Sequence, residues 1–487
     1  MNYISFDFAI FVAVAVGLFY CVPRKFRPKV LLAASLYFYL SFDARYLLYL
    51  LFVAGSTFAC ARYVENTPKG KAIIAVCVGI NAILWFGIKE LSWLVNLAND
   101  ALRIAPGSVA MPLIFRFVPV GISYYMLQGI SYLVDVYRGK IPQERSFWKY
   151  LLYLSYFPAV VQGPISRYQE LLPMMFHEKL FDVDSARKNL LRILFGLVKK
   201  MVIADRLGIL AGYCFEEYAE LRGVILYVGA VAYAFQLYTD FSGCVDICRG
   251  VSGLFGIDLV HNFERPYLAQ SIKEFWNRWH LSLSRWLKDY IYIPLGGNRK
   301  GTNRKYINLL ATFAVSGIWH GAGFQYIVWG LLNAVYQILG DVTADFRRKW
   351  KKIFGIAEGS VSERMYQRFI TFNLTALAWI FFRSATVSDA FGYLYQMLSG
   401  VNQIAFFGLD LTASGVSYLE LILLVAHLAV LLRFENGSSC QEELLDKMES
   451  LHTCIRWGLY IVLILDVVLF GIYGSGYDLS GFLYGGY

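Results

Sequence analysis

Residues Ala72–Ile88 read AIIAVCVGINAILWFGI, and this stretch decides the fold class. It holds 17 residues without a charged side chain. Because a helix needs about 20 predominantly apolar residues to cross a bilayer, a run of this length predicts a transmembrane helix. Comparable runs occur at Phe6–Val22, Tyr46–Ala61, Leu113–Val134, Gly223–Tyr238, Gln325–Leu339, Arg368–Phe382, Tyr418–Leu432 and Trp457–Phe470.

The composition of the whole chain agrees with this stretch. Of the 487 residues, 57% are hydrophobic and only 16% are charged, and the mean hydropathy is +0.49. Typical soluble proteins contain about 45–50% apolar and about 25% charged residues. Three further candidates for transmembrane helices are shorter or more polar: Val30–Leu40, Leu190–Tyr213 and Tyr306–Gly317. The pattern predicts an all-α polytopic membrane protein with about 11–12 transmembrane helices. It excludes a disordered, collagenous or small disulfide-framed protein.

The cations gather in alternate loops between the apolar runs. Arg24–Lys29, Arg138–Lys149 and Arg347–Lys352 are rich in Lys and Arg, whereas Ser384–Tyr418 contains neither. The positive-inside rule therefore places the rich loops in the cytosol, and Ser384–Tyr418 and both termini outside. The cations that raise the pI to near 9.0 are therefore explained by membrane topology and by contact with membrane lipid. We expect no nucleic-acid partner.

The eight cysteines are scattered and predict no disulfide framework. Cys244 and Cys248 lie one helical turn apart, but no second ligand pair accompanies them. We therefore expect reduced thiols there and no metal site.

His320 is the most notable of six histidines. It lies in Ser316–Gly323, which reads SGIWHGAG, between two apolar runs. If the flanking basic loops are both cytosolic, Tyr306–Leu339 must enter the membrane and return, which puts His320 about 20 Å deep. An ionisable side chain at that depth is costly, so a functional role is the default hypothesis. The alternative is a histidine that packs helices through a hydrogen bond. The three glycines of the motif would let backbone or a ligand approach closely.

His280 lies in a second motif, Phe275–Trp286, which reads FWNRWHLSLSRW. Aromatic residues recur at helical spacing over Lys273–Ile293, which predicts a helix that lies in the membrane interface. By itself, His280 would be an interfacial histidine of that helix. Arg285 and Asp289 would form a stabilising pair four residues apart.

A third cluster, Gln236–Asp246, reads QLYTDFSGCVD and closes an apolar run with two carboxylates. One interpretation is a solvated loop at a helix end. The other is a set of polar groups that line a water-filled path through the membrane.

Taken together and in order, several motifs resemble the membrane-bound O-acyltransferase family. They span about Val118 to Arg383. The matching stretches are Pro119–Tyr125, Tyr132–Arg138, Gln162–Ile165, Gln236–Asp246, Asn262–Tyr267 and the two histidine motifs. Within the family, His280–Arg299 and Trp379–Arg383 are most similar to the membrane subunit of alginate and related polysaccharide O-acetylation systems. The D-alanyl transfer proteins of teichoic-acid modification tend to diverge after the corresponding serines.

The resemblance implies one membrane domain over residues 1–487, in which transmembrane, re-entrant and interfacial helices surround a central funnel. It implies an enzyme of the bacterial inner membrane that moves an acetyl group toward an extracytoplasmic polysaccharide. The donor would be cytosolic acetyl-CoA, a substrate and not a permanently bound cofactor. His320 matches the presumed catalytic histidine and His280 the second active-site histidine. A separate extracytoplasmic acetyltransferase of the SGNH type would finish the transfer.

The chemistry fits these residues, because a hydroxyl that attacks a thioester needs a base near neutral pH. His320 would accept the hydroxyl proton and then protonate the leaving thiolate. Backbone N–H groups, Trp279, Asn277 or Arg278 would stabilise the oxyanion. The residues expected to bind substrate or line the channel are Gln236, Tyr238, Asp240, Ser242, Asp246, Asn277, Arg278, Trp279, Arg285 and Trp319.

Two other functions stay open at this point. One keeps the enzyme but transfers D-alanine from a carrier protein to teichoic acid. The other is a transporter or lipid flippase, in which His320, Asp240 and Asp246 would relay protons or bind the substrate.

Overall fold

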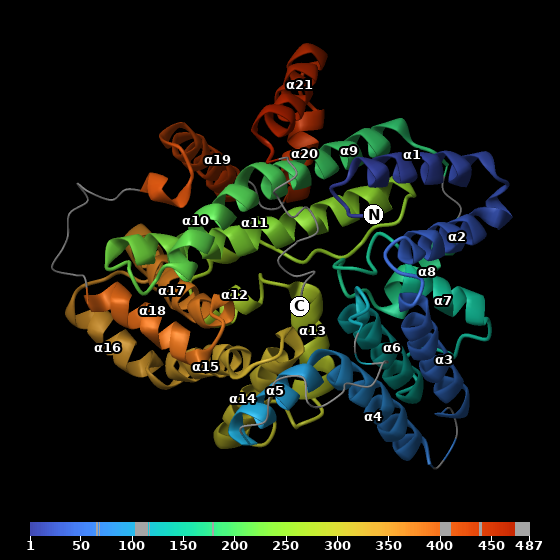
Figure 1. The fold of residues 1–487 in the computed structure, drawn as a ribbon, viewed down its shortest axis with the longest axis horizontal. Helices are drawn as coiled ribbons and strands as arrows, with labels where there is room; N and C mark the ends of the chain where they lie inside the picture. Colours follow the sequence, from blue (N-terminus) through green and yellow to red (C-terminus); the bar gives the residue numbers. More distant parts are fainter. Residues whose placement is uncertain are drawn as a thin grey trace. The chain divides into compact units, whose positions relative to one another are not determined.

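The computed structural model of the protein describes residues 1–64, 67, 69–102, 115, 117–177, 180–399, 411–437 and 441–472. Over these residues the chain forms helices and loops, and no strand is present (Figure 1). A single antiparallel bridge joins Phe263 and Trp279. The prediction of an all-α polytopic membrane protein is confirmed.

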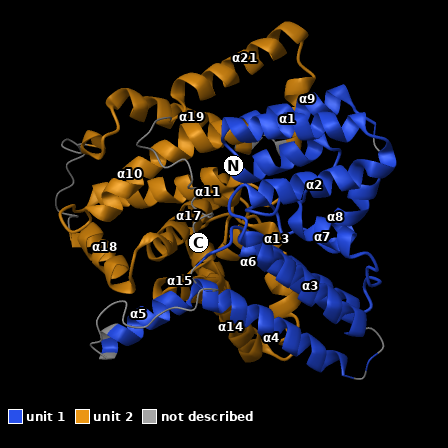
Figure 2. Cartoon of the chain, turned by 45° about the vertical axis from the view of Figure 1, so that its right-hand side comes forward, with its two compact units in different colours: residues 1–194, 244–260, 478–487 blue, residues 195–243, 261–477 orange. Residues whose placement is uncertain are grey.

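The chain divides into two compact units, which are coloured separately in Figure 2. Unit 1 covers the described residues of Met1–Leu194 and Cys244–Val260, and unit 2 covers those of Phe195–Gly243 and 261–472. The long helix α11 contributes to both units. The prediction of one continuous membrane domain stays a prediction.

Unit 1 is built on the N-terminal helices. Its elements are α1 (Phe6–Cys21), η1 (Arg24–Phe26), α2 (Arg27–Leu40), α3 (Tyr46–Val64), α4 (Gly70–Lys89), α5 (Leu91–Leu102), α6 (Ile122–Tyr137), α7 (Phe147–Ser155), α8 (Tyr168–Phe176) and most of α9 (Val183–Leu197). Phe157 lies at its centre, where the backbone carbonyl accepts a hydrogen bond from Tyr3 and the amide donates to Ser35 of α2. Burial of its ring beside Phe11 and Phe38 ties α1 and α2 to the chain after α7.

Unit 2 contains the motifs of the sequence analysis. Its elements are η3 (Val198–Ala204), α10 (Asp205–Glu216), most of α11 (Val224–Leu254), η4 (Pro266–Leu268), α12 (Ile272–Trp276), α13 (Leu281–Leu287), η5 (Lys288–Tyr292), α14 (Thr302–His320), α15 (Phe324–Val342), α16 (Ala344–Ile353), α17 (Val361–Arg383), α18 (Val387–Ser399), η6 (Leu411–Ser414), α19 (Tyr418–Gly437), α20 (Gln441–Glu449) and α21 (Thr453–Phe470).

The apolar runs coincide with helices. The stretch Ala72–Ile88 lies within α4, and the other runs correspond to α1, α3, α6, α11, α15, α17, α19 and α21. The run that was expected from Leu113 begins partly outside the described residues, and α6 starts at Ile122. In the described chain, α3, α4, α11 and α21 are long and apolar enough to cross a membrane singly. A fifth span results if α15 and α16, bent by 54°, act together. The total of about 11–12 crossings and the central funnel stay predictions.

The helical hairpin α14–α15 is held together by close contact of its two backbones (Figure 1). A Cβ atom on Gly317 of α14 would lie 2.4 Å from the carbonyl oxygen of Tyr326, and one on Gly330 of α15 would lie 2.2 Å from that of Phe313. At the open end of the hairpin, Lys305 forms an ion pair with Asp341. The stretch Tyr306–Leu339 therefore forms two helices that turn just after His320, and its entry into the membrane stays a prediction.

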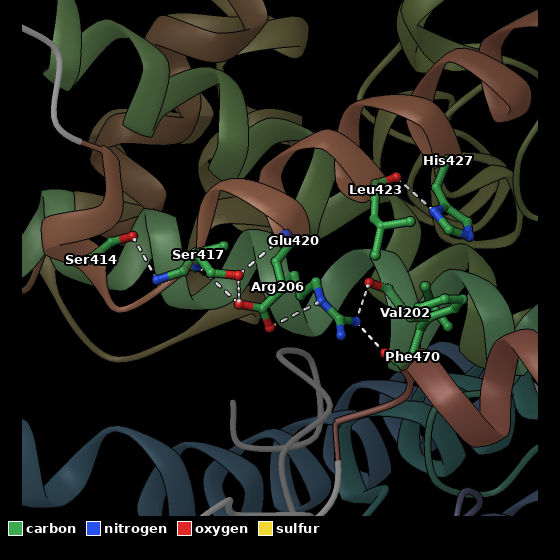
Figure 3. Close-up of polar contacts among 9 residues, drawn as sticks. Val202, Arg206, Ser414, Ser417, Glu420, Leu423, His427 and Phe470 are labelled. Carbon is green, nitrogen blue, oxygen red and sulfur yellow. Dashed lines mark hydrogen bonds and ion pairs between the residues drawn. The ribbon is translucent and has the colours of Figure 1, made fainter.

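The C-terminal helices α19 and α21 meet α10 at the guanidinium of Arg206 (Figure 3). Its Nη1 donates to the carbonyl oxygens of Val202 (3.2 Å) and Phe470, and its Nε lies 3.7 Å from Glu420. Arg206 is buried, so the charge is compensated at the end of α21 and the start of α19.

Candidate active site

The cluster Gln236–Asp246 lies inside a helix. Helix α11 continues without a break from Val224 to Leu254, so the interpretation as a loop at a helix end is wrong. The helix continues because the cluster is buried and its side chains find partners within the protein instead of water. Tyr238, Asp240 and Ser242 are each less than 5% exposed.

Asp240 forms part of a buried ion triad. The ammonium of Lys200 lies 2.5 Å from a carboxylate oxygen of Asp240 and 3.0 Å from one of Asp205. All three side chains are nearly inaccessible, and buried charges are tolerated only when they are paired in this way. Lys200 belongs to η3, a π-helical segment, and such segments are frequent near functional sites. The triad fixes α11 against η3 and α10 and places the next residue, Phe241.

The second histidine motif is broken at the histidine itself. The expected single helix over Lys273–Ile293 is wrong, because α12 ends at Trp276 and α13 begins at Leu281. His280 adopts a left-handed backbone conformation (φ 45°), which a non-glycine residue rarely does. Phe275 and Trp279 are 1% exposed, so this segment is buried and does not lie as an interfacial helix.

An adjacent chain segment forces this bend. The amide of Glu264 donates to the carbonyl of Arg278, and the amide of Leu281 donates to that of Asn262. The side-chain oxygen of Asn262 also accepts from the amide of Ser282, at 3.0 Å, and so satisfies an N–H group in the first turn of α13. The motif Asn262–Tyr267 therefore holds His280 in its strained conformation, and strain of this kind is concentrated at functional sites.

The indole ring of Trp319 lies close to both histidines. The ring of Trp319 lies 6.3 Å from that of His280 and 4.9 Å from that of His320, measured between centroids. Phe241 of α11 packs edge-on against His280 at 4.8 Å. Both histidines are at most 3% exposed. Tertiary folding thus brings together two residues that are 40 positions apart in the sequence, as the catalytic interpretation required.

The wall around His320 is aromatic. The rings of Trp329 and Phe382 lie 4.9 and 5.3 Å from the imidazole, and Trp379 stacks on Trp329 at 5.4 Å. Sequence reasoning did not place these three residues, or Phe241, in the site. A signal was present, because Trp379–Arg383 was one of the matching motifs and Phe241 lies within Gln236–Asp246.

The remaining predicted residues occupy different places. Tyr238 packs on Trp279 (6.2 Å) and donates to Glu435 of α19. Arg278 forms an ion pair with Glu274 at 2.5 Å. Asn277 and Arg285 are exposed. Gln236 lies against Gly208 of α10. Asp246 is buried on the part of α11 that belongs to unit 1.

The glycines around His320 serve helix packing. A Cβ atom on Gly321 would lie 2.7 Å from the ring of Tyr326, and one on Gly323 would lie 2.2 Å from the side chain of Gln325. Together with Gly317, they let α15 approach α14. Of the two roles that the sequence left open, close approach of the two helices is the one observed.

The site is suited to proton transfer in a water-poor environment. Burial lowers the pKa of His280 to about 3, so its imidazole is neutral near pH 7 and is a poor proton acceptor, which suits a positioning role. The indole N–H of Trp329 is buried and, within the described chain, lacks a hydrogen-bond partner. Trp329 lies beside His320, and an imidazole next to an uncommitted N–H donor is an arrangement that can activate a nucleophile and bind a developing negative charge. Nowhere in the described residues do three His, Cys, Asp or Glu side chains gather as metal ligands.

Comparison with known proteins places this chain in a family. Residues 135–353 match the membrane-bound O-acyltransferase (MBOAT) family. The chain is 32% identical over 427 residues to the probable alginate O-acetylase AlgI of Pseudomonas putida, across 85% of this chain and 84% of that protein. It is 32% identical over 422 residues to the peptidoglycan O-acetyltransferase of Helicobacter pylori, across 80% and 76%. To the teichoic acid D-alanyltransferase of Bacillus subtilis it is 28% identical over 254 residues, across 48% and 60%. The chain therefore belongs to the membrane-bound O-acyltransferase family and is a membrane-bound acyltransferase.

Proposed function

We propose that the protein transfers an acetyl group from cytosolic acetyl-CoA across the bacterial inner membrane toward an extracytoplasmic polysaccharide. The observation that carries this proposal is the shared contact of His280 and His320 with Trp319 in a buried aromatic site. Relatives named for O-acetylation of alginate and of peptidoglycan align over 85% and 80% of the chain, and both acceptors are polysaccharides.

His320 is the general base in this proposal. Its neutral imidazole accepts the proton of the acceptor hydroxyl while the hydroxyl oxygen attacks the thioester carbonyl. When the tetrahedral intermediate collapses, the carbon–sulfur bond breaks and the imidazolium returns the proton to the thiolate. The products are an acetyl ester and free CoA. His280, whose ring lies 6.3 Å from that of Trp319, positions the reacting groups.

Trp329 is the proposed oxyanion donor. Its ring lies 4.9 Å from that of His320, and its N–H group is uncommitted among the described residues. A buried N–H group without a partner is costly unless a ligand satisfies it, and a carbonyl oxygen that becomes negative is a suitable acceptor. Asn277, which the sequence offered for this role, is exposed, and Arg278 is already paired with Glu274.

A partner completes the reaction in this proposal. The similarity to alginate O-acetylases supports a polysaccharide acetylation system in which other proteins take part. We infer an extracytoplasmic acetyltransferase of the SGNH type that receives the acetyl group and passes it to the sugar. Recovery of such a protein with the full chain after mild detergent extraction is the direct test.

D-alanyl transfer is the second candidate, since the chain also resembles a teichoic acid D-alanyltransferase. That similarity has lower identity and covers less of the chain than the similarity to the O-acetylases. The transporter alternative is not supported, because family membership identifies an enzyme and Asp240 is held in an ion triad with Lys200. Purified protein should turn over acetyl-CoA and leave a D-alanyl carrier unused; the reverse result would select the second candidate.

His320→Gln tests the mechanism. The amide occupies a similar volume but cannot take up and return a proton at neutral pH. Acetyl transfer to a hydroxyl acceptor should fall by about 10²-fold or more, while the variant folds and still binds the donor. His280→Ala should lower transfer by a smaller factor. Transfer by His320→Gln close to the wild-type rate would remove His320 from the mechanism.

A further inference from the structure

A basic pocket lies in unit 1, and no residue of the histidine site lines it. Its volume is about 390 Å³, within the range of small-ligand sites. It is formed where the η1–α2 corner meets the start of α7 and the end of α8. Two loops that the charge pattern independently assigned to the cytosol, Arg24–Lys29 and Arg138–Lys149, both contribute to it.

The pocket carries a strong excess of positive charge. Five cations line it, namely Arg24, Lys25, Arg27, Lys29 and Lys149. The described residues that line it include no Asp or Glu. Three of these ammonium groups lie over aromatic rings: Lys25 and Lys29 over Phe26 at 5.2 Å each, and Lys149 over Phe176 at 4.9 Å. These contacts hold the lysines at the pocket without neutralising them.

Two helix N-termini add to the same field. Helix α2 begins at Arg27, and α7 begins at Phe147, and residues from the first turn of each helix line the pocket. The dipole of each helix places partial positive charge at its N-terminus, and the first N–H groups of α7 have no partner within that helix. At α2 the amide of Arg27 donates to the carbonyl of Arg24 and Pro28 has no N–H group, so α2 contributes its dipole alone. Ser146, the N-cap of α7, lines the pocket and makes no capping hydrogen bond, so its hydroxyl is available to a ligand. The combination selects for an anion such as a phosphate group.

The surroundings of the pocket are apolar. Trp148 is 64% exposed at its rim, and Phe176 is 39% exposed. Just beyond α8, Leu180 and Phe181 are 72% and 51% exposed. Exposed Trp beside Lys and Arg at the end of an apolar run is typical of the membrane interface. A soluble phosphate gains nothing from this rim, whereas a lipid places its acyl chains along it.

We propose that this pocket binds the phosphate headgroup of an anionic phospholipid from the cytosolic leaflet. Basic pockets between helices on the cytosolic side recognise such headgroups. The same phosphate chemistry is offered by soluble phosphate esters, and the apolar rim is what favours the lipid. The site lies within unit 1 and is independent of the proposed acetyl transfer.

The test uses the full chain purified in a neutral detergent. Phosphatidylglycerol is added, and binding is measured by native mass spectrometry and by the shift in melting temperature, with phosphatidylcholine as the neutral lipid. The pocket variant is Lys25→Gln/Lys29→Gln/Lys149→Gln. The matched control is Arg347→Gln/Lys349→Gln/Lys352→Gln, which removes three exposed cations of α16. We expect the pocket variant to lose affinity for phosphatidylglycerol on the order of 100-fold, roughly a factor of five for each charge. The control variant should bind like the wild type.

Several outcomes would overturn the proposal. Wild-type binding by the pocket variant excludes this pocket, and an equal loss in both variants shows non-specific attraction. Displacement of phosphatidylglycerol by coenzyme A at similar concentration shows a site for soluble phosphate esters. If the pocket variant does not fold, a photoactivatable phosphatidylglycerol is cross-linked to the wild-type protein instead. Labelling of the peptide that contains Trp148 supports the site, and labelling only elsewhere excludes it.

Discussion

At the residue scale, the site depends on where two imidazoles meet aromatic rings. His320 ends α14 against Trp329 and Phe382, and His280 occupies a bend with positive φ. An imidazole enclosed by aromatic rings loses water, which strengthens every electrostatic contact that remains. The same enclosure leaves the N–H group of Trp329 without a described partner, and this is the most informative polar atom of the site.

The variant Trp329→Phe distinguishes the contribution of the indole N–H group from that of the aromatic ring. Phenylalanine keeps an aromatic side chain beside His320 but cannot donate a hydrogen bond. Loss of one oxyanion donor should lower kcat by about 10²-fold or more, with the KM for the acyl donor little changed. Trp276→Phe is the control, because Trp276 packs on Trp329 (5.7 Å) while its own N–H group donates to Asn333. If both variants keep the wild-type kcat per folded protein, Trp329 has only a packing role.

At the scale of the elements, the α14–α15 hairpin determines the position of His320. Gly317→Ala should destabilise the protein, because the new Cβ atom would meet the backbone carbonyl of Tyr326 and neither helix can yield without moving His320. Overpacking of this kind typically costs about 1–3 kcal/mol. Gly340→Ala on α15 is the matched control, since nothing lies within 4 Å of its Cβ position. Melting temperatures measure the effect, and equal values for the two variants would contradict it.

At the scale of the whole molecule, the loops should alternate across the membrane. Lys352 is exposed at the end of α16 and should be cytosolic, and the segment after α17 should be extracytoplasmic. Residues 400–410 of the predicted outer stretch Ser384–Tyr418 lie outside the described residues. Ser384 itself is buried and donates to the carbonyl of Ile380, so the exposed Ala385 is the better probe.

Single cysteines at positions 352 and 385, in a cysteine-free background, test this topology with a membrane-impermeant thiol reagent. Intact spheroplasts should label Ala385→Cys alone, and Lys352→Cys should react only after permeabilisation. Labelling of Lys352→Cys from outside in intact cells would contradict the predicted orientation of the α16 loop.

Hydropathy, charge and motif order alone determined much of this protein. Apolar runs such as Ala72–Ile88 and Tyr46–Ala61 predicted helices to within a few residues, because a helix in lipid must satisfy its own backbone whatever surrounds it. The sequence also predicted a role for His320, since an ionisable side chain between two apolar runs is costly without one, and its catalytic role stays a prediction.

Only the tertiary structure decided how the motifs meet. Local periodicity predicted one helix through His280, but the segment bends because Asn262 and Glu264, which precede α12 in the sequence, pair with it. Periodicity in Gln236–Asp246 gave no sign that Lys200 would compensate Asp240 and allow α11 to continue. Pairs of this kind have no fixed spacing in the sequence. The position of each polar group is therefore determined by tertiary contacts and not by the local sequence.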